Sequence, residues 1–173
     1  MAFHPPACIL PLTSVNERLT SMETHQYSHL GGSDALPKAE LDEILAAISR
    51  CKIPIERGVG PELRNDILDG LKEQGWTDKV QVAHGSKISI ASQKNRVGLG
   101  IQTAGNMSRM YADLIKLQQM YLDGLIDVGA LILPTAVAAR TLGDNLANSD
   151  RLEGELAIFR KVIHIPLVIF SFQ

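Results

Sequence analysis

The stretch that decides the fold is SKISIASQKNRVGLGIQTAGN, which runs from Ser86 to Asn106. Apolar residues alternate with small or polar ones on both sides of the tripeptide Lys94–Arg96, a period of two that is typical of strands paired through a turn. The second strand presents alternate residues to opposite faces, with Val97, Leu99 and Ile101 on one and Gly98, Gly100 and Gln102 on the other. The stretch therefore predicts a β-hairpin followed by a helix that Asn106 caps.

The rest of the chain alternates helical and strand patterns around this hairpin. The periodicity predicts helices over residues 38–50, 61–74, 107–124, 135–142 and 149–162, and strands over 79–84, 87–92, 96–102, 125–133 and 163–172. The order of helix, helix, β-meander, helix, strand, helix and strand predicts an α/β fold with a mixed β-sheet between helical layers. Residues 1–36 lack clear periodicity and are expected to form an N-terminal arm or cap, and residues 37–173 a single domain.

Composition limits the class of protein. The chain has 173 residues, of which 45% are hydrophobic and 21% charged, a balance that suits one domain with a core and argues against disorder. Cys8 and Cys51 form no motif, which favours free thiols in a reducing compartment. The apolar runs are too short to span a bilayer, and the first residues do not resemble a signal peptide. We expect a cytoplasmic protein with no membrane segment.

Positive charge is concentrated in one part of the chain. The net charge is −2, yet residues 79–116 contain six basic residues and a single acid, Asp113, a local balance of +5 (6 − 1). A basic zone within a nearly neutral chain suits an anionic ligand, although a solvated face is the plainer interpretation.

The hairpin and the helix before it resemble a known family. The segments GVGPELRNDILDGLKEQGW (58–76) and IASQKNRVGLGIQTAGN (90–106) resemble PD-(D/E)xK type II restriction endonucleases of the BglII/BstYI-type branch, and the resemblance extends over about residues 58–172. The hairpin keeps the branch's residues at Ile90, Lys94, Asn95, Val97, Ile101, Gln102, Gly105 and Asn106. The resemblance implies a restriction-endonuclease-like fold and a homodimer that binds double-stranded DNA and hydrolyses it with Mg²⁺.

The sequence departs from the family at the two metal-binding positions. The family's Asp falls on Ala91 and its Glu on Gly100, whereas its third active-site group is retained as Gln102. Mg²⁺ prefers carboxylate oxygens, so a single neutral amide is a poor ligand. Glu62 is the best candidate for a replacement acid, ahead of Asp66, Asp69 and Asp78, although a solvated helix or loop charge is the plainer interpretation of all four. We therefore expect a disabled Mg²⁺ site, lost either naturally or by deliberate inactivation.

Five residues are candidates for DNA contact. Lys94, Asn95 and Arg96 occupy the predicted turn, where they could reach phosphates or a minor groove, or could form an ordinary polar turn. Arg109 and Lys116 lie on the following helix outside its apolar stripe, and their alternatives are solvent exposure or, for Lys116, pairing with Asp113. Two functions stay open: a DNA-binding, nuclease-like protein with a disabled site, or a non-catalytic subunit that binds DNA or a protein partner.

Overall fold

The structure of the protein is a computed structural model that describes residues 22–173. Its elements, in chain order, are β1 (Thr24–His29), α1 (Gly32–Ala35), α2 (Lys38–Arg50), α3 (Gly60–Lys72), β2 (Val80–Gln81), β3 (Ser89–Ile90), β4 (Ser92–Lys94), β5 (Val97–Ile101), α4 (Met107–Leu122), β6 (Val128–Pro134), α5 (Ala136–Leu142), α6 (Ser149–Phe159) and β7 (Leu167–Phe172). No helix in this part of the chain is long and apolar enough to cross a membrane.

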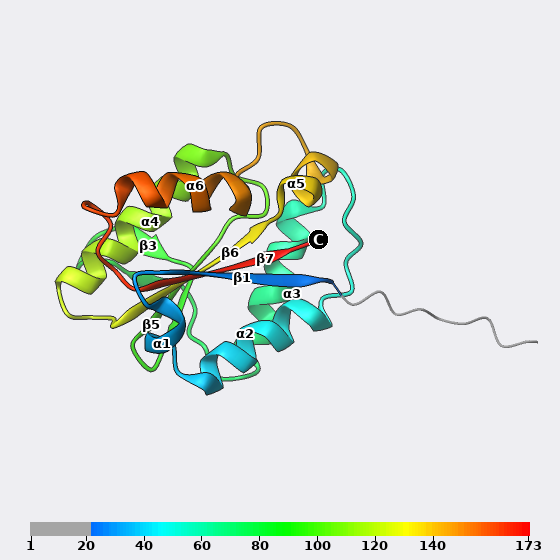
Figure 1. Ribbon diagram of the computed structural model, residues 1–173. Coiled ribbons are helices and arrows are strands. Elements are labelled where there is room, and N and C mark those ends of the chain that lie inside the picture. The colour runs from blue at the N-terminus through cyan, green and yellow to red at the C-terminus, as the bar shows by residue number, and fades with distance from the viewer. Residues whose placement is uncertain (1–21) are drawn as a thin grey trace, which may run out of the picture.

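A five-stranded mixed sheet forms the centre of the molecule. Its strand order is β1-β7-β6-β5-β4, in which β5, β6 and β7 are parallel and the edge strands β1 and β4 are antiparallel to their neighbours. Helices α2 and α3 cover one face, and α4 and α6 cover the other (Figure 1). The predicted α/β fold with a mixed sheet between helical layers is confirmed.

The central strand shows why the layers form. All seven residues of β6 are buried, as expected of a strand covered on both faces. Ala130 and Ile132 pack into the cluster that contains the apolar residues of α2 and α3, whereas Leu131 and Leu133 pack with α4 and α6. Each face of the sheet therefore has its own hydrophobic core.

The hairpin is confirmed, but the predicted meander is wrong in part. Asn95 and Arg96 have φ values of 44° and 65°, as a two-residue type I′ turn requires, and β4 pairs with β5 across it. The strand expected over 87–92 is interrupted at Ala91, whose N–H donates to the Leu99 carbonyl at 3.0 Å. Residues before Ala91 pair only with β2, so β2 and β3 form a separate two-stranded ribbon.

Strand β1 has no counterpart among the predicted elements. It pairs antiparallel with β7 along its whole length, from Thr24 opposite Phe172 to His29 opposite Leu167. As an edge strand it has only one buried residue, His29, so its sequence carries little apolar alternation, and β7 provides the backbone groups with which it pairs. The expected arm thus contains an ordered strand in residues 22–36; its first part, residues 1–21, lies outside the described residues.

Candidate functional site

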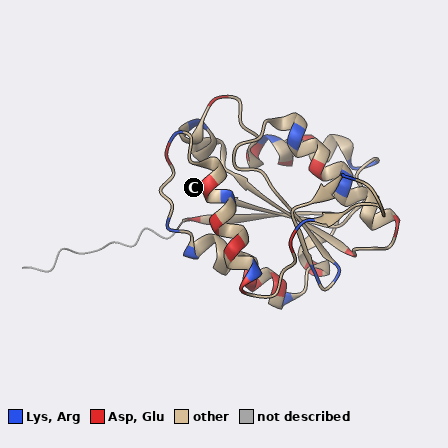
Figure 2. Ribbon diagram, turned by 180° about the vertical axis from the view of Figure 1, so that it is seen from behind, with Lys and Arg blue, Asp and Glu red and all other residues tan. Residues whose placement is uncertain are grey.

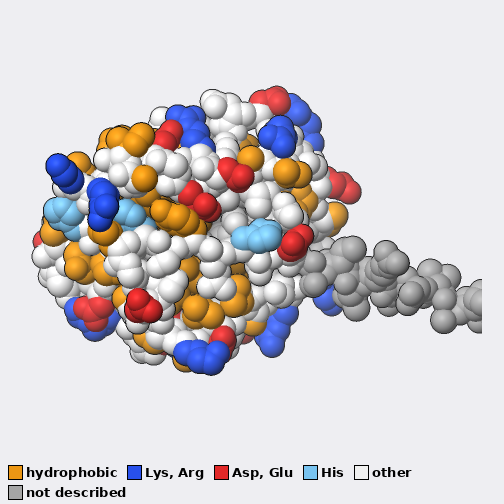
Figure 3. Space-filling view, in the orientation of Figure 1, with side chains coloured by type: hydrophobic (Ala, Val, Ile, Leu, Met, Phe, Trp, Pro, Cys, Tyr) orange, Lys and Arg blue, Asp and Glu red, His pale blue; other side chains and the backbone are white. Residues whose placement is uncertain are grey.

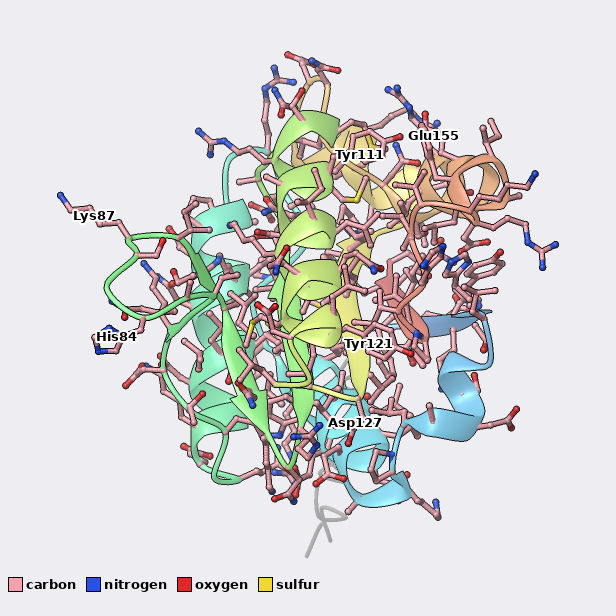
Figure 4. All side chains as sticks on the ribbon, turned by 90° about the vertical axis from the view of Figure 1, so that its left-hand side faces the viewer. His84, Lys87, Tyr111, Tyr121, Asp127 and Glu155 are labelled. Atoms are coloured by element: carbon pink, nitrogen blue, oxygen red, sulfur yellow. The ribbon has the colours of Figure 1, made fainter. Side chains whose placement is uncertain are left out.

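A cleft of about 380 Å³ opens where β5 ends, between the first turns of α3 and α4. Its lining includes Arg64, Lys79, Ala91, Gln102, Arg109 and Lys116. The structure therefore brings together four of the residues that the sequence singled out, namely Ala91, Gln102, Arg109 and Lys116. Figure 4 shows α4 in front, and the segment between β2 and β3, which contains His84 and Lys87, projects to one side.

A close backbone approach holds the two walls of the cleft together. The hydroxyl of Thr103, just after β5, donates to the Gly60 carbonyl at the start of α3 at 2.5 Å. A Cβ on Gly60 would lie 2.5 Å from the Thr103 carbonyl oxygen, so only glycine permits this contact. Arg64 follows one turn later and lines the cleft.

Three polar side chains are joined by hydrogen bonds on the α4 wall. The Gln102 amide donates from Nε2 to Asp113 Oδ2, and Lys116 Nζ donates to Asp113 Oδ1 at 2.8 Å. The side chains of Asp113 and Lys116 are only 13% and 25% exposed, which strengthens their attraction. Both carboxylate oxygens of Asp113 are thus engaged by groups of the protein itself.

Gly105 makes this arrangement of Gln102 feasible. A Cβ on Gly105 would lie 2.1 Å from Gln102 Oε1, closer than any side chain could tolerate. The predicted cap is also present, since Asn106 Oδ1 accepts from the Arg109 N–H at 3.2 Å. The segment TAGN therefore both seats Gln102 and begins α4.

Gly100 lies beneath the same network, on the face of the sheet that α4 covers. A Cβ built on Gly100 would lie 2.5 Å from Leu131 Cδ2 and 3.4 Å from Asp113 Cβ, with Asp113 Oδ2 at 3.8 Å. Leu131 and Asp113 therefore take up the space that an acidic side chain at position 100 would need. Asp113 is the site residue that sequence reasoning missed, although it was visible as the single acid of the basic zone.

The donor set of the cleft does not fit Mg²⁺. This hard cation needs several oxygen ligands, preferably from more than one carboxylate. Ala91 and Gly100 have no side-chain oxygen, and the one carboxylate, Asp113, already binds Lys116 and Gln102. Within residues 22–173, no group of three His, Cys, Asp or Glu residues comes together as a metal site would require.

The side chains that line the cleft are mostly positively charged. Within residues 22–173, four basic residues and one carboxylate line it. Arg64, Lys79 and Arg109 form no salt bridge with any described residue, since every ion pair of residues 22–173 involves other side chains. Elsewhere in the molecule, basic and acidic residues are interspersed (Figure 2). The excess of positive charge is therefore a local property of the cleft.

The predicted turn residues lie at the opposite end of β5 and are engaged in the fold. Lys94 Nζ pairs with Glu43 of α2 at 2.6 Å, and Asn95 donates to the buried Glu40 at 2.6 Å. Arg96 binds Asp127 through two hydrogen bonds of 2.7 Å, which hold the pKa of the Asp127 carboxyl below its usual range.

The acids proposed as replacements also lie outside the lining of the cleft. Glu62 is exposed on the first turn of α3, between the lining residues Pro61 and Arg64, but does not itself contribute. Asp78 forms a salt bridge with Lys72, in which Lys72 Nζ lies 2.6 Å from Asp78 Oδ1. The residues Asp66 and Asp69 lie on α3 and are exposed. None of the four supplies a carboxylate to the cleft lining.

The sheet, its hairpin and the two helical layers define a restriction-endonuclease-like fold, which two solved structures share. "Crystal structure of restriction endonuclease BGLII complexed with DNA 16-mer" is 12% identical, with a TM-score of 0.75 over 87% of this chain and 76% of that chain. "Crystal structure of free BglII" is also 12% identical, with a TM-score of 0.70 over 88% and 80%.

The family follows from the sequence match. The family model described as restriction endonuclease BglII/BglIII matches residues 24–172. The chain therefore belongs to the BglII/BglIII family of PD-(D/E)xK restriction endonucleases, and the resemblance noted in the sequence is confirmed. Its members generally use Mg²⁺. No curated protein matches the chain by sequence.

Proposed function

We propose that this chain binds double-stranded DNA in the cleft at the end of β5 and cleaves it weakly or not at all. The observation that carries the proposal is the charge of the cleft, in which three basic side chains without partners among the described residues surround a carboxylate that is already neutralised. Such a lining favours a backbone phosphate. The absence of oxygen ligands at Ala91 and Gly100 supports the loss of efficient hydrolysis.

Binding is tested by titrating a labelled DNA duplex with the full chain at low salt and then at increasing salt. Phosphate contacts predict tight binding at low salt and a linear loss of log affinity with log salt concentration. Replacement of Arg64 or Arg109 by Gln should reduce the slope by roughly one each, because each removes one phosphate contact. Arg151→Gln is the matched control, since Arg151 lies on α6 and pairs with Glu155.

Cleavage is tested with supercoiled plasmid DNA incubated with the chain and Mg²⁺ or Mn²⁺. Persistence of the supercoiled form is expected, and efficient conversion to linear DNA would refute the disabled site. Absence of duplex binding at low salt would instead remove DNA as the ligand and favour the alternative role, a non-catalytic subunit that binds a protein partner.

A homodimer is part of the proposal, because a two-fold dimer can read a palindromic site. Exposed apolar residues support an interface: Ile158 and Phe159 at the end of α6 are 75% and 41% exposed, and Val162, just after the helix, is 65% exposed. Some of the orange side chains that are scattered over the face in Figure 3 lie where α6 is. Sedimentation of the free chain tests this part.

A cytoplasmic location also belongs to the proposal, supported by Cys51, a buried free thiol.

A further inference from the structure

We propose that the cleft binds a phosphodiester with the Lys116 ammonium in the role that a divalent metal ion would otherwise have, so that DNA binding is independent of divalent cations. This inference rests on the proposed function and concerns how the same cleft achieves it. It starts from the mismatch between the ligand set of the cleft and Mg²⁺.

The carboxylate of the cleft is neutralised by groups of the chain itself. A cleft with several unpaired carboxylates repels a phosphate until a divalent ion neutralises them. Here Asp113 is the only carboxylate of the lining among the residues that the structure describes, and Lys116 Nζ lies 2.8 Å from its Oδ1. The Gln102 amide satisfies the other oxygen. The repulsion that a metal ion would remove is therefore already removed within the chain.

The Lys116 ammonium is placed where a ligand in the cleft can reach it. Lys116 lines the cleft, three residues after Asp113 on α4, and its side chain is 25% exposed. An ammonium has three donors, and among the described residues its hydrogen bonds go only to Asp113, which leaves donors available to a ligand. Partial burial makes that charge more effective than one on the open surface.

Three further basic side chains line the cleft around Lys116. Arg64 and Lys79 approach from the α3 side and Arg109 from the first turn of α4, so the phosphate would be contacted from both walls. With Lys116 paired to Asp113, these three residues leave a net charge of about +3 in the lining (4 − 1). A phosphodiester carries one negative charge per nucleotide, so the cleft needs no additional cation.

The test measures the affinity of the full chain for a labelled duplex in EDTA and in Ca²⁺ or Mg²⁺ at constant ionic strength. The unsubstituted chain should bind equally well in all three buffers, to within about twofold. Lys116→Met keeps the aliphatic stem but exposes the Asp113 charge, so its affinity in EDTA should fall by at least about tenfold. Divalent ions should recover part of that loss.

Two further variants identify the cause. Asp113→Asn should bind at least as tightly as the unsubstituted chain in EDTA. The double variant with Lys116→Met should recover part of the affinity that Lys116→Met loses and should show no response to divalent ions. Lys38→Met is the control, because Lys38 pairs with Asp42 on α2 at 2.9 Å, away from the cleft lining. Circular dichroism of each variant checks that it is folded.

Two results would overturn the inference while the proposed function stands. One is a tenfold or greater gain in affinity of the unsubstituted chain on addition of Ca²⁺ or Mg²⁺, on the order expected for neutralisation of a repulsive site. The other is a Lys116→Met variant that behaves like Lys38→Met. If no duplex binds at low salt in any buffer, the proposed function fails and the inference fails with it.

Discussion

Asp113 packs against Gly100, with its Oδ2 3.8 Å from the position that a Cβ on Gly100 would occupy. The carboxylate thus comes from helix α4, whereas the family's acid would come from strand β5. Because Lys116 and Gln102 hold Asp113, this carboxylate orders the wall of the cleft and is not available as a free ligand.

Gly100→Glu should destabilise the chain by about 2 kcal/mol, because the new side chain must displace Leu131 and place a second negative charge beside Asp113. Asp113→Asn in the same chain should reduce that cost, since it removes the repulsion. Urea unfolding of the two single variants and the double variant measures the coupling. Additive costs would show that Asp113 and position 100 do not interact.

Efficient cleavage by this chain should require more than two substitutions. Ala91→Asp and Gly100→Glu together supply the family's carboxylates, but the steric conflict with Leu131 and the charge of Asp113 remain. Adding Asp113→Asn and Leu131→Val should therefore increase Mg²⁺-dependent nicking of plasmid DNA above that of the double variant. Equal nicking by the double and quadruple variants would contradict this structural explanation.

Lys94→Met should affect folding and leave DNA binding intact. Its ammonium bridges Glu43 at 2.6 Å and the Gln74 carbonyl at 2.7 Å, and the other Glu43 oxygen accepts from Trp76 at 2.8 Å. Breaking this half-buried group should cost about 1–3 kcal/mol, which urea unfolding followed by the emission of Trp76, the only tryptophan, would report.

The control for that experiment is Lys38→Met, whose exposed pair with Asp42 should be worth less than about 1 kcal/mol. A large loss of DNA affinity in Lys94→Met, with no loss of stability, would return Lys94 to the DNA-binding role that the sequence suggested.

Cys51 should be unreactive in the folded chain. Burial raises the pKa of the Cys51 thiol to about 11, and Asp66 adds to the increase, so little thiolate is present near neutral pH. In a Cys8→Ser chain, alkylation by iodoacetamide should be at least about 100-fold slower than in urea. Because the acid form is favoured, the native rate should keep rising by about tenfold per pH unit between about pH 8 and about pH 10.

The pH profile of the same chain in urea is the comparison for Cys51. There the thiol should titrate near its ordinary pKa of about 8.5, and its rate should level off above that value. A native profile that levels off at the same pH would show that Cys51 is neither buried nor perturbed.

Local pattern determined most of the fold. Helices α2, α3 and α4, the hairpin turn at Asn95 and Arg96, and the buried strands β6 and β7 follow from periods of 3.6 and two and from residues that cap or turn the chain. The motif around Gln102 was enough to indicate the family. These features depend on neighbours in sequence, so a single sequence contains them.

Tertiary structure decided the rest. Strand β1 forms by pairing with the edge of β7. The sequence of residues 24–29 has no pattern that predicts this pairing. The sequence predicts the turn residues Lys94–Arg96 as candidates for DNA contact, and only the tertiary structure shows that α2 and the loop before β6 place carboxylates beside Lys94 and Arg96. Asp113 looked like a helix charge paired with Lys116, and only the packing of α4 on β5 set that pair beside Gly100 and Gln102. Long-range packing fixes which charges are neutralised, and therefore which remain available to a ligand.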